Sequence, residues 1–209
     1  MKKKFFLLTI ITIVSLVSVF LARGIYYMVS NATYHPQDGD VIFHVSKSSQ
    51  STAIQIGTLS RYSHCGVIIM KDGKPYVLEA ERGVELTPMD KWINRGIMGN
   101  HYRVMRLKDK QDLTLDYTLG GKYDRNFQFN NGKYYCSELV WEMYANNGIL
   151  LSEPKEMQDY YCLFLPMIKR HIKERGFKLD QEVVAPVDLV KSKKLKTVSY
   201  GYWKPFWNK

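Results

Sequence analysis

The sequence feature that most restricts the fold is an Asp-Gly pair between two apolar runs. Asp72-Gly73 separates Cys65–Met70 (CGVIIM) from Pro75–Ala80 (PYVLEA). Asp-Gly readily adopts the two positive φ angles of a tight hairpin turn, so apolar runs on either side of it tend to pair as antiparallel strands. The sequence therefore predicts a sheet that contains this β-hairpin.

A two-residue turn also determines which residues face each other across the hairpin. Counting back from the turn, Gly66 faces Glu79 and His64 faces Glu81. Because side chains alternate along a strand, His64, Glu79 and Glu81 then lie on one face of the sheet. The hairpin thus brings two carboxylates near one imidazole ring, and either could accept a hydrogen bond from it.

The thiol of Cys136 directly precedes the clearest helix of the chain, Ser137–Asn147, which Gly148 ends. A thiol at a helix start faces unpaired N–H groups and the positive end of the helix dipole, which favour the thiolate. With His64 as its base and Glu79 or Glu81 to orient the ring, such a thiol can attack the carbonyl of an amide or ester. This pattern predicts acyl transfer through a thioester.

The remaining segments predict one α+β domain, in which an antiparallel sheet carries helices packed on one side. The sequence shows no internal repeat or linker that would divide it. Further strands are expected at 41–45, 84–86, 102–107, 183–185 and 197–202, and further helices at 48–59, 88–95, 113–119 and 161–175.

The N-terminus predicts an apolar helix outside this domain. Lys2–Lys4 precede the apolar run Phe5–Ala22, which is long enough to span a bilayer. Ala22 is the only small residue at the end of the run, which favours an uncleaved signal anchor over a cleaved signal peptide. The lysines would stay in the cytoplasm and the domain outside it. We expect residues 1–23 to form the anchor, 24–37 a tether and 38–209 the domain.

Charge and cysteine content exclude several classes of function. The net charge is +10, but four of these charges come from the anchor region and the chain carries no nucleic-acid-binding motif. The thiols at 65, 136 and 162 lack the spacing of zinc ligands, so neither a metal nor a cofactor is expected. A disulfide between Cys65 and Cys162 remains open for an exported protein.

Several motifs, taken in order, resemble the circularly permuted papain-like branch of the NlpC superfamily, the YiiX-like amidases. His64 precedes Cys136 by 72 residues, as the permuted order requires. The motifs are GDVIF at 39–43, SRYSHCGV at 60–67, VLEA at 77–80, GKYD at 121–124, YYCSELV at 134–140 and PVDL at 186–189.

The resemblance implies roles for individual residues. It makes Cys136 the nucleophile, His64 the general base and Glu79, rather than Glu81, the orienting carboxylate. It also implies that Tyr134 or Tyr135 lines the pocket or helps to hold an oxyanion. Aromatic residues near the cysteine are expected to form an apolar pocket mouth, namely Tyr123, Phe127, Phe129, Tyr134 and Tyr135.

The sequence therefore predicts an exported bacterial cysteine hydrolase in the cell envelope, anchored to the membrane through its N-terminal segment. Its expected substrate is an amide or ester of an envelope peptide or lipid. Two alternatives remain open: an acyltransferase that uses the same thioester, and a non-catalytic module that binds lipid or peptidoglycan. The oligomeric state is not determined.

Overall fold

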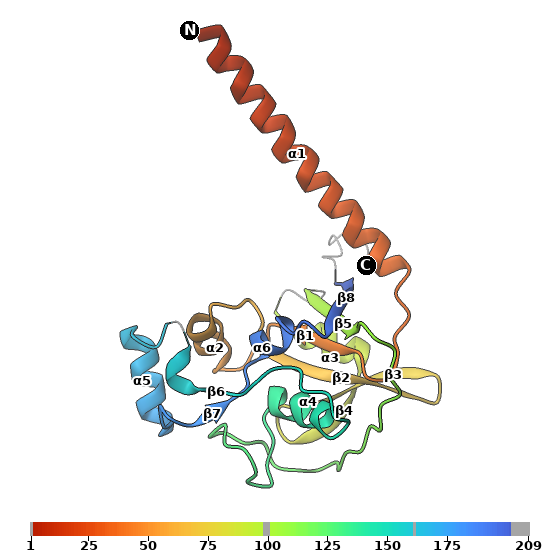
Figure 1. Cartoon of the computed structure of the whole chain (residues 1–209), viewed down its shortest axis with the longest axis vertical. Helices are drawn as coiled ribbons and strands as arrows, with labels where there is room; N and C mark the ends of the chain where they lie inside the picture. The colour runs from red at the N-terminus through yellow and green to blue at the C-terminus, as the bar shows by residue number, and fades with distance from the viewer. Residues whose placement is uncertain (1, 98–100, 161, 202–209) are drawn as a thin grey trace.

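The centre of the molecule is an antiparallel β-sheet (Figure 1). The computed structural model describes residues 2–97, 101–160 and 162–201. Within these ranges six strands form the sheet in the order β4-β3-β2-β1-β5-β8. The strands are β1 Val41–His44, β2 His64–Lys71, β3 Lys74–Ala80, β4 Val84–Pro88, β5 Tyr102–Leu107 and β8 Leu195–Tyr200.

Helices pack against this sheet and beside one end of it. In Figure 1, α4 lies in front of the sheet, while α2, α5 and the small β6–β7 pair gather at its left end. The helices are α1 Lys2–Ala32, α2 Ser51–Thr58, α3 Met89–Arg95, α4 Cys136–Ala145, α5 Pro166–Arg175 and α6 Pro186–Val190. The short elements are β6 Lys155–Glu156, the 3₁₀ turn Met157–Asp159 and β7 Glu182–Val183.

The predicted hairpin is confirmed in its register. Lys71 pairs with Lys74, and the same register continues to the pair Val67 and Leu78. Asp72 and Gly73 have φ angles of 51° and 72°, the left-handed conformation that this turn requires. The α+β class is confirmed with it.

Both faces of the sheet are apolar and covered. Val67 on one face packs with Val140 of α4 in the larger core cluster. Ile68, the next residue of the strand, packs on the opposite face with the fully buried Trp92 of α3. This alternation along one strand makes β2 the element that joins the two layers.

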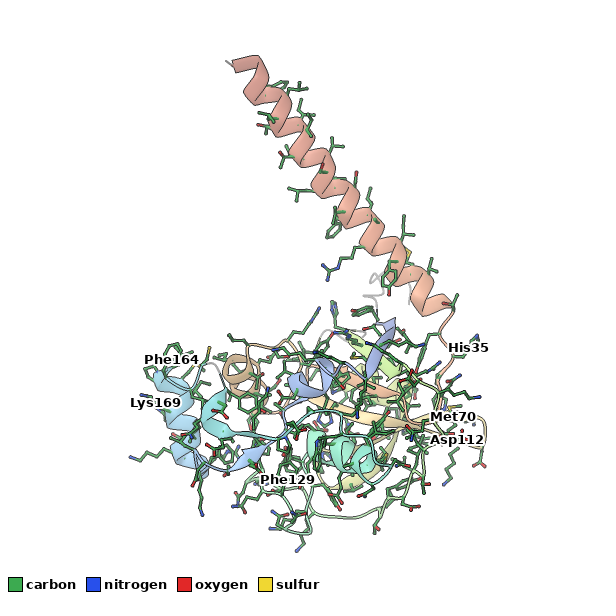
Figure 2. All side chains as sticks on the ribbon, viewed as in Figure 1. His35, Met70, Asp112, Phe129, Phe164 and Lys169 are labelled. Carbon is green, nitrogen blue, oxygen red and sulfur yellow. The ribbon has the colours of Figure 1, made fainter. Side chains whose placement is uncertain are left out.

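The N-terminal helix stands away from the domain. Its stretch Phe6–Tyr26 is long and apolar enough to cross a membrane, and none of it is buried. Figure 2 shows its side chains projecting from a helix that leaves the domain. The helix continues to Ala32, so most of the segment expected as a tether is helical.

The helix predicted at 113–119 is wrong. Residues 111–118 form no regular structure, and Leu113 and Leu115 pack against the core from an irregular segment. The Asn147 side chain accepts from the backbone N–H of Thr114 at 2.7 Å and donates to its carbonyl at 2.9 Å. These two bonds satisfy backbone groups that a helix would otherwise pair internally.

Several predicted elements have different boundaries; the helix expected at 48–59, for example, spans 51–58. Pro166 is a predicted kink or start of the helix expected at 161–175, and the helix begins there, because proline is favoured in the first turn of a helix and cannot donate a hydrogen bond within one. The strand expected at 197–202 occupies 195–200. Tyr161 and Tyr202, the outer ends of the two predictions, lie outside the described residues.

Candidate active site

The hairpin places His64 beside Glu79. His64 is the first residue of β2, and its Nε2–H donates to Glu79 Oε2 at 2.7 Å. Both side chains are buried, Glu79 completely. The register that the Asp-Gly turn sets therefore produces the imidazole–carboxylate contact that the sequence predicted.

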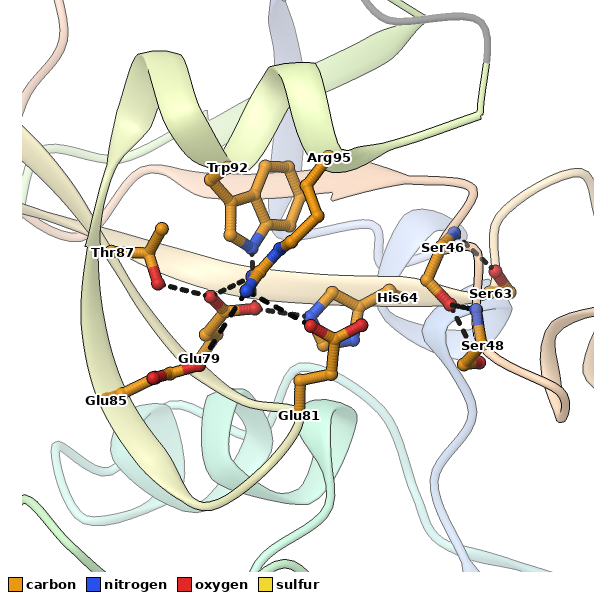
Figure 3. Close-up of polar contacts among 10 residues, drawn as sticks. All are labelled: Ser46, Ser48, Ser63, His64, Glu79, Glu81, Glu85, Thr87, Trp92 and Arg95. Atoms are coloured by element: carbon orange, nitrogen blue, oxygen red, sulfur yellow. Dashed lines mark hydrogen bonds and ion pairs between the residues drawn. The ribbon is translucent and has the colours of Figure 1, made fainter.

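Glu79 accepts three more hydrogen bonds (Figure 3). Thr87 Oγ1 donates to Oε1 at 2.6 Å, Trp92 Nε1–H donates to Oε2 at 2.8 Å, and Arg95 donates to Oε1. Burial alone would raise the pKa of Glu79, but the hydrogen bond and charge of His64, followed by Thr87 and Arg95, lower it overall. The carboxylate is therefore ionised and fixed in position.

Glu81, the other candidate carboxylate, has a different partner. Its Oε2 lies 3.1 Å from Arg95 Nη1, and its side chain is 21% exposed, whereas that of Glu79 is fully buried. Figure 3 shows Glu79 between His64 and Thr87, with Arg95 reaching both glutamates. Of the two carboxylates, only Glu79 has a hydrogen bond to the imidazole among the contacts of the described residues.

Cys136 begins α4, as the sequence predicted to within one residue. Tyr135, the residue before it, is extended, and its backbone N–H donates to the Glu138 carboxylate at 3.3 Å. This contact satisfies one of the N–H groups that a helix start leaves unpaired. Cys136 is 5% exposed, so its sulfur lies in a largely desolvated site.

The sulfur of Cys136 interacts with both His64 and Cys65. A hydrogen bond from the Cys65 thiol is the largest influence that lowers the pKa of Cys136. Burial acts in the opposite direction, and the charge and hydrogen bond of His64 lower the pKa further, so that it falls well below the usual value. The lowered pKa favours the thiolate form of this sulfur.

His64 changes in the opposite direction. Burial alone would lower its pKa, but the charge and hydrogen bond of Cys136, and then those of Glu79, raise it to about 10. A thiol with a lowered pKa beside an imidazole with a raised pKa forms a thiolate–imidazolium pair.

Cys65 is fully buried in the cluster that also contains Cys136. Burial raises the pKa of its thiol well above the usual value, and the interaction with Cys136 raises it further. Cys65 therefore stays protonated and acts as a donor. All three cysteines are free, so no Cys65–Cys162 disulfide is present in the described structure.

The three predicted tyrosines have different surroundings. Tyr123 contacts the cavities around Cys136, and its hydroxyl donates to Gln50 Oε1 at 3.4 Å. Tyr135 is buried, and its hydroxyl accepts from the Val184 N–H at 3.1 Å. Tyr134 is not brought to the site: its hydroxyl donates to Glu142 at 3.2 Å, on a different side of α4.

Two cavities meet at Cys136. The first is almost entirely apolar, is half open to solvent, and lies between α2, α5 and the start of α4. Of the five aromatic residues expected at a pocket mouth, Tyr123, Phe127 and Tyr135 line it, and Phe129 packs on Trp141 instead. The second cavity is predominantly polar and contains His64. Cys136 therefore lies between an apolar cavity and a polar one.

The sequence analysis missed the partners that hold Glu79 and the role of His44. Trp92 and Arg95 stand three positions apart on a predicted helix, but no local pattern indicates which sheet face that helix covers. His44 is buried and stacks on Trp92 with ring centroids 3.7 Å apart. Burial lowers its pKa to about 2, so it is neutral beside His64.

The comparisons with known proteins agree with this geometry. A family model described as permuted papain-like amidase enzyme, YaeF/YiiX, C92 family, matches residues 35–199. The chain is 37% identical over 177 residues to the uncharacterized protein YiiX of Escherichia coli K12, a match that covers 79% of this chain and 87% of that protein.

A solved structure provides the spatial counterpart. It is described as that of the metalloprotein YiiX from Escherichia coli O157:H7, and it matches with a TM-score of 0.74 at 34% identity, covering 81% of this chain and 99% of that one. In the described part of the present chain, no group of three or more His, Cys, Asp or Glu side chains is arranged to hold a metal ion.

Proposed function

Because the chain belongs to the YaeF/YiiX family of permuted papain-like amidases, we propose that it is a cysteine amidase of the bacterial cell envelope with Cys136 as its nucleophile. The observation that carries the proposal is the arrangement of Cys136, His64 and Glu79. A thiol at a helix start interacts with an imidazole whose other nitrogen donates to a buried carboxylate at 2.7 Å.

In the proposed first step, the Cys136 thiolate attacks the carbonyl carbon of an amide. The backbone N–H of Cys136, at the start of a helix, is positioned to donate to the developing oxyanion. The imidazolium of His64 gives its proton to the leaving nitrogen, the C–N bond breaks, and an amine departs from a thioester.

In the second step, water replaces the amine. Neutral His64 takes a proton from the water as its oxygen attacks the thioester carbonyl, and the sulfur leaves as a thiolate. The products are a carboxylic acid and the regenerated ion pair. Glu79 keeps Nε2 of His64 protonated in both steps, so that the other ring nitrogen faces the sulfur.

The apolar cavity supports an acyl chain as the group attached to the carbonyl. It opens beside Cys136 and is lined almost wholly by carbon atoms. We propose that α1 anchors the enzyme in a membrane, with Lys2–Lys4 in the cytoplasm and the domain outside it. An anchored domain with an apolar chamber is suited to amphiphilic substrates of the envelope.

The direct test is acylation of the full chain in detergent micelles with the fluorogenic amide N-dodecanoyl-7-amino-4-methylcoumarin. We expect release of the coumarin and a mass increase equal to one dodecanoyl group on Cys136. Cys136→Ser should abolish both, while Cys162→Ser, which changes a free cysteine outside both cavities, should leave both intact. Turnover that survives in Cys136→Ser would overturn the proposal.

The alternative of a non-catalytic module makes a different prediction for the thiol. A poised thiolate reacts with iodoacetamide at neutral pH far faster than an ordinary thiol. Selective alkylation of Cys136 over Cys65 and Cys162 supports the enzyme. Absence of both selective alkylation and acylation would support a binding module instead.

A further inference from the structure

The polar cavity beside the nucleophile carries excess positive charge. Four cationic side chains line it: Arg82 just after β3, Lys122 and Arg125 in the loop before α4, and Arg175 in the last turn of α5. Glu81 is the only acidic residue in the lining. These cations come from three separate segments of the chain, which the fold gathers around one space.

The chain does not neutralise these cations internally. Glu81 already pairs with Arg95 at 3.1 Å, and none of the four cations forms an ion pair within the described residues. Arg82, Lys122 and Arg125 are exposed, and Arg175 is half-buried. Like charges around one cavity repel each other, and a bound anion would remove that repulsion.

Neutral donors line another part of the same cavity. The segment before α2 contributes Ser46, Ser48, Ser49 and Gln50 to the lining. Ser46 Oγ donates to Ser48 Oγ at 2.9 Å, so these hydroxyls are already held in place. Guanidinium groups, an ammonium group and hydroxyls are the donors that proteins use for carboxylates and phosphates.

We propose that the polar cavity binds an anionic group, a carboxylate or a phosphate, on the amine side of the substrate. This inference rests on the proposed function and specifies its substrate class. The two cavities share Cys136, Tyr123 and Ile54 in their linings, so one molecule can reach into both. The substrate is then an amide with an apolar acyl chain in one cavity and an anionic amine component in the other.

Four amides with the same acyl chain and amine components of different charge test this selectivity with the full chain in neutral detergent. They are N-dodecanoylglycine, with a carboxylate; N-dodecanoylphosphoethanolamine, with a phosphate; N-dodecanoylethanolamine, which is neutral; and N-dodecanoylethylenediamine, which is cationic. We expect kcat/KM for an anionic amide to exceed that for the neutral one by about 10–100-fold, and to fall as salt screens the cavity. The better of the two anions identifies the group that the cavity prefers.

Charge removal provides the matched control. Arg82→Gln with Arg175→Gln should lower kcat/KM for the anionic amides about tenfold or more and leave the neutral amide nearly unchanged. Lys173→Gln removes one positive charge from an exposed site on α5 that does not line the cavity, and should alter none of the four. Equal kcat/KM for neutral and anionic amides, or an equal loss of kcat/KM for the anionic amides in the Arg82/Arg175 and Lys173 variants, would overturn this inference. Either result would leave the proposed amidase function unaffected.

A probe that needs no turnover separates the two proposals. Iodoacetate and iodoacetamide alkylate thiolates similarly except for the charge of iodoacetate. We expect the rate ratio of iodoacetate to iodoacetamide at Cys136 to exceed that of a free cysteine peptide and to fall in the Arg82/Arg175 variant. A ratio no greater than that of the peptide overturns the anion site, whereas failure of both reagents to prefer Cys136 overturns the proposed function and this inference together.

Discussion

Replacing Glu79 with glutamine tests the central contact of the site. Glu79→Gln keeps the shape of the side chain but removes the negative charge that faces His64 and Arg95. The imidazole then loses the carboxylate that helps to keep it protonated, and a glutamine amide can present N–H₂ where four donors need an acceptor.

The magnitude follows from the number and kind of these bonds. Two of the four donors are cationic, and a hydrogen bond to a charged group contributes about 1.5–3 kcal/mol. The amide oxygen of the new glutamine can still accept some of these hydrogen bonds, so not all of that energy is lost. We therefore expect the free energy of unfolding to fall by about 2–4 kcal/mol. Loss of the oriented imidazole should lower kcat/KM by about 10²–10⁴-fold.

The assay compares three glutamates that all contact Arg95. Glu79→Gln, Glu81→Gln and Glu85→Gln are measured for kcat/KM on the dodecanoyl coumarin amide and for the free energy of unfolding in urea. Glu85 is 43% exposed and 3.7 Å from Arg95, and a pair of that kind contributes at most about 1 kcal/mol. Glu85→Gln should therefore match the wild type.

The result that would refute this reasoning is a reversed order of effects. If Glu81→Gln lowers kcat/KM more than Glu79→Gln, with both variants equally folded, then Glu81 is the carboxylate that acts on His64. Trp92→Phe provides a milder check, because it removes the 2.8 Å hydrogen bond to Glu79 and some buried volume but keeps an aromatic ring beside His44. It should lower kcat/KM less than Glu79→Gln does.

Three further predictions use other parts of the site. The pH profile of kcat/KM should be flat over the range in which Cys136 is ionised and His64 is protonated. At acid pH kcat/KM falls as the thiolate takes up a proton below its lowered pKa, and at alkaline pH it falls as His64 loses its proton near pH 10. A midpoint near pH 6.5 on the alkaline side would contradict the ion pair. Cys65→Ala removes the hydrogen bond that most lowers the pKa of Cys136, so the acid midpoint should rise, whereas Cys65→Ser keeps a donor and should shift it less; iodoacetamide alkylation rates against pH measure both. Gly66→Ala places a methyl group 2.6 Å from the Leu78 carbonyl oxygen, so it should cost about 1–3 kcal/mol of stability in urea unfolding, and wild-type stability would show that the hairpin adjusts freely.

Local sequence patterns were sufficient for the elements whose partners lie nearby. The Asp-Gly turn determines the register of β2 and β3, and strict alternation then puts His64 and Glu79 on one face. The start of α4 at Cys136 follows from the apolar periodicity after it. The segment 113–119 has a helical composition, but its backbone bonds to Asn147 across the molecule, and composition carries no information about such a partner.

The residues around Glu79 could not be predicted, because they depend on which layer covers which face. Trp92 and Arg95 reach Glu79 only when α3 folds over the face of the sheet opposite α4. The pattern of 88–95 predicts a helix and no more. Cys65 was placed in the core correctly, yet its contact with Cys136 depends on the packing of α4 against β2, which is long-range.

The position of His64 explains how two layers supply one site. Cys65 faces the layer that contains Cys136 and α4, whereas Glu79 bonds to Trp92 in the layer of α3. A sheet normally separates side chains on its two faces, so a nucleophile in one layer and a carboxylate in the other meet only where a strand ends. His64 is the first residue of β2; there one ring nitrogen donates to Glu79, and Cys136 lies near enough to raise the pKa of the ring. The proposed arrangement of Cys136, His64 and Glu79 therefore requires the strand to begin at this residue. Moving the start of β2 by one position would place an imidazole on the face that Cys65 occupies.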